Sequence, residues 1–236
     1  MMRQLVLAGV ALAALSVSVQ GQTRPRDPFV FRTAVRAGDL NGAPLNCAAA
    51  SECKNRLVAV LLNAQMTALY STESGTLYLT RNGLPQNGND TYSHTQYGQR
   101  LQWPASGAGT TLHRSTVTQG WELMQGGSPV ASTIVYKGFN LAGNIVSLKW
   151  RLVAGATAVD ITEMPEYASV GGSPGLTRTV VVNGLGSGQS LRLNLSGQVR
   201  PETWTVQSGG TLEGTSPVYL NIAGNGTAIV TGSWTP

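Results

Sequence analysis

The sequence predicts an all-β protein, an antiparallel β-sandwich with one large pair of sheets or two fused pairs, and little helix. Apolar and polar residues alternate along many short runs, β-branched residues are common in those runs, and glycine-rich turns separate them. Of the 236 residues, 29 are glycine and only 11% are charged. This composition excludes a disordered chain, a coiled coil and collagen.

Residues 1–21 have the features of a secretory signal peptide. Arg3 supplies a positive charge, an apolar run of about eleven residues follows it, and small side chains precede a cleavage point before Gln22. The apolar run is shorter than the roughly 20 residues that cross a bilayer, so we expect no membrane span. The mature protein is therefore expected to be secreted or periplasmic.

Cys47 and Cys53 are the only cysteines of the chain. Their spacing does not fit a Cys-x-x-Cys redox motif, and no nearby histidine completes a zinc site. In an exported protein such a pair favours a local disulfide, which contributes at most a few kcal/mol because the loop that it closes is small. The fold is therefore expected to depend on its apolar core.

The clearest strand covers residues 145–153, where Val146, Leu148, Trp150 and Leu152 alternate with polar residues. One face of this strand is expected to be buried and the other to face solvent. The same alternation places Asp160 on an outward face. Further strands are expected at residues 76–81, 133–136, 157–162, 179–182, 191–195, 219–222 and 228–231.

Residues 57–70 are apolar almost throughout, and they allow two interpretations. Leu57, Leu61, Ala64 and Ala68 have the spacing of a helix, but the same run also fits two strands that turn at residues 63–65. We favour two strands, because Tyr70 leads directly into a turn sequence and another strand.

Two glycine-rich turns have specific expected roles. Residues 224–226 are expected to join residues 219–223 and 227–234 in a terminal hairpin. Residues 184–188 superficially resemble a nucleotide-binding fingerprint, but no helix follows them, so a hairpin loop is expected there.

Residues 85–111 form a polar segment that is too long for a simple hairpin loop. This segment separates an N-terminal β subdomain, residues 22–84, from a C-terminal β-sandwich, residues 112–236. It either decorates one sheet or links two subdomains, so the sequence leaves open whether the protein has one core or two.

Several short segments resemble a known family. They are 27–32 (DPFVFR), 57–60 (LVAV), 68–78 (ALYSTESGTLY), 135–139 (VYKGF), 148–152 (LKWRL), 159–165 (VDITEMP) and 175–179 (GLTRT). Together they resemble the N-terminal β-sandwich module of exported bacterial cytochrome c and sugar-dehydrogenase-like proteins. The resemblance implies an exported β-sandwich module. We expect no electron-transfer role here, because the sequence contains no Cys-x-x-Cys-His haem attachment.

Aromatic residues in polar surroundings are the candidate ligand-binding groups. Flat aromatic rings stack on sugar faces, and polar loops supply hydrogen bonds to the hydroxyl groups. The alternative for the tryptophans is packing at a sheet edge or between sheets, and the alternative for the histidine is plain exposure in a loop. The candidates are Tyr92, His94, Tyr97, Trp103 and Trp121.

Groups for catalysis or metal binding are few. His94 and His113 are the only histidines, and neither has the spacing of a metal ligand, so we expect no metal and no cofactor. Glu163 and Glu166 are the nearest acidic candidates for an acid–base pair with His94. Both are expected where a strand ends and a turn follows, which favours a solubilising role.

The sequence therefore favours an exported, non-catalytic module that binds a carbohydrate or a cell-envelope partner. One alternative is a structural protein that self-associates through sheet edges into homo-oligomers, a matrix or a filament. The other is a sugar-active enzyme that uses His94 and a glutamate. The formal net charge is +5, but the basic residues are spread singly, which argues against nucleic-acid binding.

Overall fold

The protein is described here from a computed structural model, which describes residues 30–36, 53–62, 66–82, 86–87, 101–102, 110–115, 117–197 and 199–235. The described part is built of antiparallel sheets, which confirms the predicted all-β sandwich. The expected signal peptide and Cys47 lie outside the described residues, so the export and disulfide predictions stay predictions. No helix within the described residues is long and apolar enough to cross a membrane.

The first sheet has the order β1-β2-β3-β4-β7. Its strands are β1 (Val30–Arg36), β2 (Cys53–Leu62), β3 (Met66–Ser71), β4 (Leu77–Asn82) and β7 (Thr111–Arg114). β2 and β3 pair antiparallel, which confirms the preferred two-strand interpretation of residues 57–70. Every described residue of β3 is buried, so both faces of this strand are covered and the run is apolar throughout.

The central sheet has six strands in the order β10-β11-β12-β13-β18-β15. They are β10 (Thr133–Ala142), β11 (Ile145–Ala154), β12 (Thr157–Val170), β13 (Ser173–Asn183), β18 (Gly226–Trp234) and β15 (Glu202–Ser208). Residues 163–166 lie inside β12, so the expected strand end there is wrong. β12 continues through Pro165 because its ladder with β11 stops at Glu163, and an unpaired side tolerates a residue without an N–H group.

The third sheet has the order β16-β17-β14-β8-β9. Its strands are β16 (Thr211–Glu213), β17 (Tyr219–Ile222), β14 (Gln189–Asn194), β8 (Trp121–Gln125) and β9 (Ser128–Val130). A separate short pair joins β5 (Gln86–Asn87) and β6 (Leu101–Gln102).

Two predicted hairpins are instead crossovers between sheets. β17 pairs with β14 and β16, whereas β18 pairs with β13 and β15, so residues 224–226 lead from the third sheet to the central sheet. Residues 184–188 likewise connect β13 of the central sheet with β14 of the third sheet. A glycine-rich turn fits both a hairpin and a crossover between sheets, because the chain reverses direction in each.

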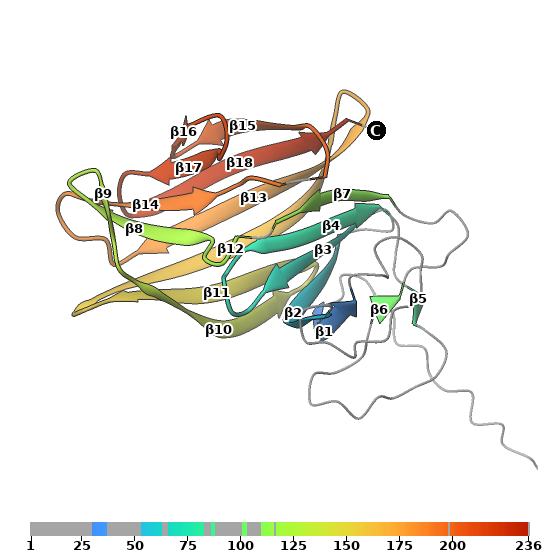
Figure 1. Ribbon diagram of the computed structural model, residues 1–236, viewed down its shortest axis with the longest axis horizontal. Coiled ribbons are helices and arrows are strands. Elements are labelled where there is room, and N and C mark those ends of the chain that lie inside the picture. Colours follow the sequence, from blue (N-terminus) through green and yellow to red (C-terminus); the bar gives the residue numbers. More distant parts are fainter. Residues whose placement is uncertain are drawn as a thin grey trace, which may run out of the picture.

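The main apolar core lies between the central sheet and the other two sheets, which lie side by side (Figure 1). A smaller cluster of Leu57, Ala59, Leu69 and Leu79 lies on the other face of the first sheet. β12 contacts β2 of the first sheet, and β11 contacts β8 of the third sheet. Residues from both predicted segments, 22–84 and 112–236, belong to the same core cluster. The described strands on the two sides of the polar segment also share a sheet, since β4 pairs with β7.

Candidate binding surface

Four of the five candidate ligand-binding residues lie outside the described residues. They are Tyr92, His94, Tyr97 and Trp103. Their proposed stacking and hydrogen bonding with a sugar therefore stay predictions, as does the acid–base role of His94.

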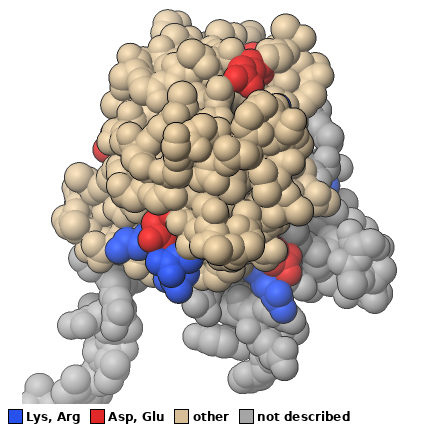
Figure 2. Space-filling model, turned by 90° about the vertical axis from the view of Figure 1, so that its left-hand side faces the viewer, with Lys and Arg blue, Asp and Glu red and all other residues tan. Residues whose placement is uncertain are grey.

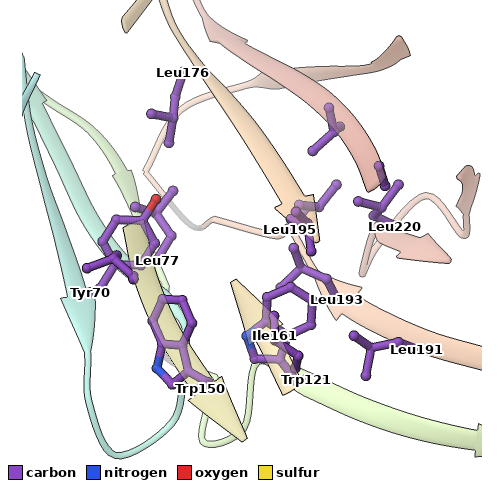
Figure 3. Packing of buried hydrophobic residues seen from close by; sticks show 14 of the residues in the cluster. Tyr70, Leu77, Trp121, Trp150, Ile161, Leu176, Leu191, Leu193, Leu195 and Leu220 are labelled. Atoms are coloured by element: carbon purple, nitrogen blue, oxygen red, sulfur yellow. The ribbon is translucent and has the colours of Figure 1, made fainter. Parts of the chain in front are cut away.

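The fifth candidate, Trp121, is fully buried between the sheets. Its indole Nε1–H donates to the carbonyl oxygen of Gly75 at 2.9 Å. Figure 3 shows its ring among Ile161, Leu191 and Leu193. Gly75 has a φ of 65°, and a Cβ there would lie 2.8 Å from Trp121 Cδ1, so only glycine allows this close approach. The side chain thus follows the packing alternative and offers no surface to a ligand here.

A buried polar set joins the first and central sheets. Glu163 accepts Nε–H and Nη2–H of Arg178 at 2.6 and 2.9 Å and the hydroxyl of Tyr70 at 2.8 Å. Burial, together with the negative charge of Glu163, raises the pKa of Tyr70 well above its ordinary value. Because Glu163 is inaccessible and fully engaged, it does not serve as the acid or base of a sugar-active site.

A second polar set closes the sandwich near β7 and β15. Glu202 Oε1 lies 2.5 Å from His113 Nδ1 and accepts Trp234 Nε1–H at 3.1 Å, while Oε2 accepts Trp204 Nε1–H at 3.0 Å. His113 Nε2 faces the carbonyl oxygen of Leu77 at 3.1 Å. Burial alone would raise the pKa of Glu202. The hydrogen bond and the charge of His113, together with the hydrogen bonds from the Trp204 and Trp234 indoles, outweigh burial, so the pKa of Glu202 is lowered. This set is structural, since both His113 and Glu202 are enclosed.

The carboxylates on the outer face of the central sheet are exposed. Asp160 points outward, as predicted, and receives Nε–H and Nη2–H of Arg151 at 2.7 and 2.9 Å. The bond from Arg151 lowers the pKa of Asp160. Glu166 is also exposed. No group of three or more histidine, cysteine or acidic side chains in the described ranges is placed to hold a metal ion.

The outer face of the third sheet carries the most organised polar constellation that remains accessible. Leu191 and Leu193 of β14 point into the core, so Arg192 points outward, and the register places Glu122 of β8 and Asn221 of β17 beside it. Arg192 Nε–H and Nη2–H donate to Glu122 Oε2 at 2.8 and 2.6 Å. The guanidinium also lies 4.2 Å from the ring centroid of Tyr219.

This constellation extends to the edge of the sheet. Asn221 Nδ2–H donates to Glu213 Oε1 at 2.6 Å, and Glu213 is paired in register with Tyr219. The side chains of Arg192 and Glu122 are 22% and 31% exposed, so they are held in place yet reachable from solvent. The face thus combines an aromatic ring, a guanidinium, an amide and two carboxylates in fixed positions. One cation stands beside two carboxylates, a balance that disfavours strongly anionic ligands.

The end of the molecule at the left of Figure 1 offers a contrasting surface. Figure 2 shows this end largely free of charge, with the charged side chains in view set along its margins. Its turns, residues 125–128, 154–157, 183–189, 208–211 and 223–227, contain no charged residue. Two of them are locked together, since Leu185 N–H donates to Asn225 Oδ1 and Asn225 Nδ2–H donates to the oxygen of Leu185. These turns contain no aromatic ring for stacking.

Comparison with known proteins gives no family for this chain. No protein-family model matches it, and no curated protein matches it either. The candidate surface therefore rests on its own geometry. Sequence reasoning missed it because Glu122, Arg192 and Tyr219 are far apart in the chain and meet only through the strand order β17-β14-β8. The one available signal was the outward alternation of Arg192 between leucines.

Proposed function

We propose that this protein is an exported, non-catalytic β-sandwich module that binds a neutral carbohydrate through the outer face of the third sheet. The resemblance to modules of exported bacterial proteins and the signal-peptide features of residues 1–21 support the exported location. The polar face around Arg192 supports the choice of ligand.

The observation that carries the proposal is the fixed stacking of the Arg192 guanidinium on Tyr219, with Glu122 holding the guanidinium from the side. Sugars are recognised by flat apolar rings together with planar polar groups whose hydrogen-bonding directions are set in advance. Prior fixation lowers the entropy that binding must overcome. The acidic excess on this face favours a neutral sugar over an acidic one.

The state of the ionisable groups supports binding over catalysis. An acid–base pair needs groups that reach the substrate, and Glu163, Glu202 and His113 are enclosed and engaged with protein partners. The exposed Asp160 is held by Arg151. Within the described residues, the candidate acid–base groups named here are enclosed or held by a partner, whereas the polar groups around Arg192 are accessible, which suits a module that holds a ligand.

The strand order weakens the alternative of self-association through the terminal strands. β17 and β18 each have a partner on both sides, so neither presents an open edge. The edge strand β9 contains Pro129, and the edge strand β10 contains a bulge beside Lys137. Prolines, bulges and lysines are devices that discourage edge-to-edge pairing.

The experiment is co-sedimentation of the purified protein with a panel of insoluble and soluble polysaccharides. Intrinsic fluorescence is a poor reporter, because the described tryptophans are at most 8% exposed. We expect Arg192→Ala and Tyr219→Ala each to weaken binding about tenfold or more, the effect of losing a stacked or charge-assisted contact. Arg151→Ala, which removes an arginine from the opposite layer, is the matched control and should bind like the wild type.

A fourth variant separates the two candidate surfaces. If Trp103→Ala removes binding while Arg192→Ala and Tyr219→Ala leave it intact, the predicted aromatic segment is the binding site and the third sheet is not. Absence of binding to every polysaccharide tested contradicts the carbohydrate proposal as a whole.

A further inference from the structure

The edge of the central sheet formed by β10 and β11 combines exposed apolar side chains with a cluster of cations. Within the described residues, four of the eight exposed large hydrophobic side chains lie on these two strands. They are Val135, Phe139, Leu141 and Ile145, which are 43–48% exposed. Single exposed apolar residues are ordinary, but this edge gathers half of the exposed large hydrophobic side chains of the described residues. Such a concentration favours contact with an apolar or interfacial environment.

The register shows how these side chains surround the edge. Phe139 and Leu141 pair with Leu148 and Val146, which are buried, so they lie on the core side of the sheet where its edge strand is no longer covered. Val135 pairs with the outward Arg151 and so lies on the outer face. Apolar side chains therefore project from both sides of the same edge strand.

Three cations lie near the same edge, and two of them, Lys149 and Arg151, are on the outer face of the sheet, opposite the core-side Phe139 and Leu141. Lys137 lies in the β10 bulge opposite Lys149 of β11, and Arg151 is two residues further along β11. Lys137 and Lys149 are exposed, and they are two of the three lysines of the chain. Asp160 is the adjacent carboxylate and is bound by Arg151, so the group carries three positive charges minus one, a net of +2. The next carboxylate on β12, Glu163, is buried on the core side and bound by Arg178. The next exposed one, Glu166, lies beyond the part of β12 that pairs with β11.

We propose that the β10–β11 edge docks on an anionic membrane surface, with Phe139 and Leu141 entering the interface and Lys137, Lys149 and Arg151 facing the lipid phosphates. Interfacial binding needs both components, because apolar burial and attraction to acidic lipids add to each other. An acidic polysaccharide would use the cations alone and leave the apolar side chains in water. A partner strand would meet an interrupted ladder, since the bulge between Tyr136 and Gly138 breaks the register.

The test is sedimentation of the chain without residues 1–21 with vesicles of phosphatidylcholine mixed with phosphatidylglycerol, and with vesicles of phosphatidylcholine alone. The chain should bind the anionic vesicles more tightly and lose affinity with added salt. Lys137→Ala and Lys149→Ala should each weaken binding about fivefold, since a cation near such a surface contributes about 1 kcal/mol. The double variant Phe139→Ser with Leu141→Ser should also weaken binding, by roughly tenfold, and keep its salt dependence.

Arg200→Ala is the charge-matched control, because it removes one cation away from this edge and should bind like the wild type. Equal binding to both vesicle types overturns the proposal, as does an Arg200→Ala loss equal to that of Lys149→Ala. If the Phe139 and Leu141 double variant binds normally, the edge recognises anions in general and the lipid assignment is wrong. A dimer that forms without lipid and disappears in this double variant would assign the edge to a second copy instead. Arg192→Ala should retain vesicle binding, which keeps this test separate from the carbohydrate proposal.

Discussion

Two arginine–carboxylate pairs on opposite faces of the central sheet have nearly the same geometry and very different surroundings. Arg178 binds Glu163 through Nε–H and Nη2–H at 2.6 and 2.9 Å, and Arg151 binds Asp160 through the same two groups at 2.7 and 2.9 Å. The side chains of the first pair are 1% and 0% exposed, whereas those of the second are 43% and 54% exposed. Burial, and not geometry, therefore distinguishes the two pairs.

The difference in burial gives the Arg178–Glu163 pair a role in stability that the Arg151–Asp160 pair lacks. Water screens the exposed pair and competes for its hydrogen bonds, so the pair adds little to stability. The buried pair has exchanged water for protein partners, and loss of either member leaves a charge without compensation. The Arg192–Glu122 pair stands between these extremes, at 22% and 31% exposed, which keeps it fixed and still open to a ligand.

The largest expected effect is that of Arg178→Ala. It leaves the Glu163 carboxylate buried without its cation and should lower the free energy of unfolding by about 3–5 kcal/mol. Urea denaturation followed by circular dichroism measures this change. The triple variant Arg178→Met, Glu163→Leu and Tyr70→Phe is the control and should recover most of the loss, because no charge and no unpaired hydroxyl is then buried. A loss below about 1 kcal/mol for Arg178→Ala would remove the distinction between the two pairs.

The next effect concerns Glu202, whose burial is less complete. Glu202→Gln should lower the free energy of unfolding at neutral pH by about 2 kcal/mol, since the carboxylate accepts bonds from His113, Trp204 and Trp234. Because the folded-state pKa of Glu202 is lowered, its contribution is present above the ordinary carboxyl pKa and is lost as the pH falls through the folded-state value.

The pH series supplies the decisive comparison for Glu202. The difference in unfolding free energy between wild type and Glu202→Gln should shrink as the pH falls below about 4. Chemical denaturation at several acidic pH values measures it. A difference that stays constant down to the most acidic point would show that the charge of Glu202 does not contribute.

Arg192→Ala is expected to affect stability less than Arg178→Ala or Glu202→Gln does, and to weaken carbohydrate binding. The partly exposed pair with Glu122 should contribute less than about 1 kcal/mol to the free energy of unfolding. The same substitution should weaken carbohydrate binding about tenfold, as measured by isothermal titration with the best ligand of the panel. A large loss of stability with unchanged binding would place this pair with Arg178 and Glu163 instead.

The smallest effect is expected for Arg151→Ala. Because this pair is exposed, its removal should leave the urea midpoint within experimental error, and added salt should not alter the result. A midpoint shift as large as that of Arg178→Ala would show that exposure does not govern the energetics of these pairs.

The sequence predicted the fold class well, because apolar and polar residues alternate along a strand wherever a sheet has one buried face. Val146, Leu148, Trp150 and Leu152 are all buried, and their neighbours on β11 are more exposed. The pattern was ambiguous in β3, because both faces of that strand are buried and alternation disappears.

Connections and the candidate surface were harder to predict. Whether residues 224–226 form a hairpin or a crossover depends on which strands pair, and alternation does not specify partners. The same holds for Glu122, Arg192 and Tyr219, which become neighbours through non-consecutive pairing. The burial of Trp121 depends on the glycine at position 75, 46 residues earlier in the chain, whose lack of a side chain admits the indole ring.

Carbohydrate binding by the third sheet can be located with a map of backbone amide chemical-shift changes when the best carbohydrate ligand is added. We expect changes concentrated on β8, β14, β16 and β17, centred on Arg192 and Tyr219, with the outer face of the central sheet unchanged. Changes confined to residues 85–111, or centred on Arg151 and Asp160, would contradict the proposal.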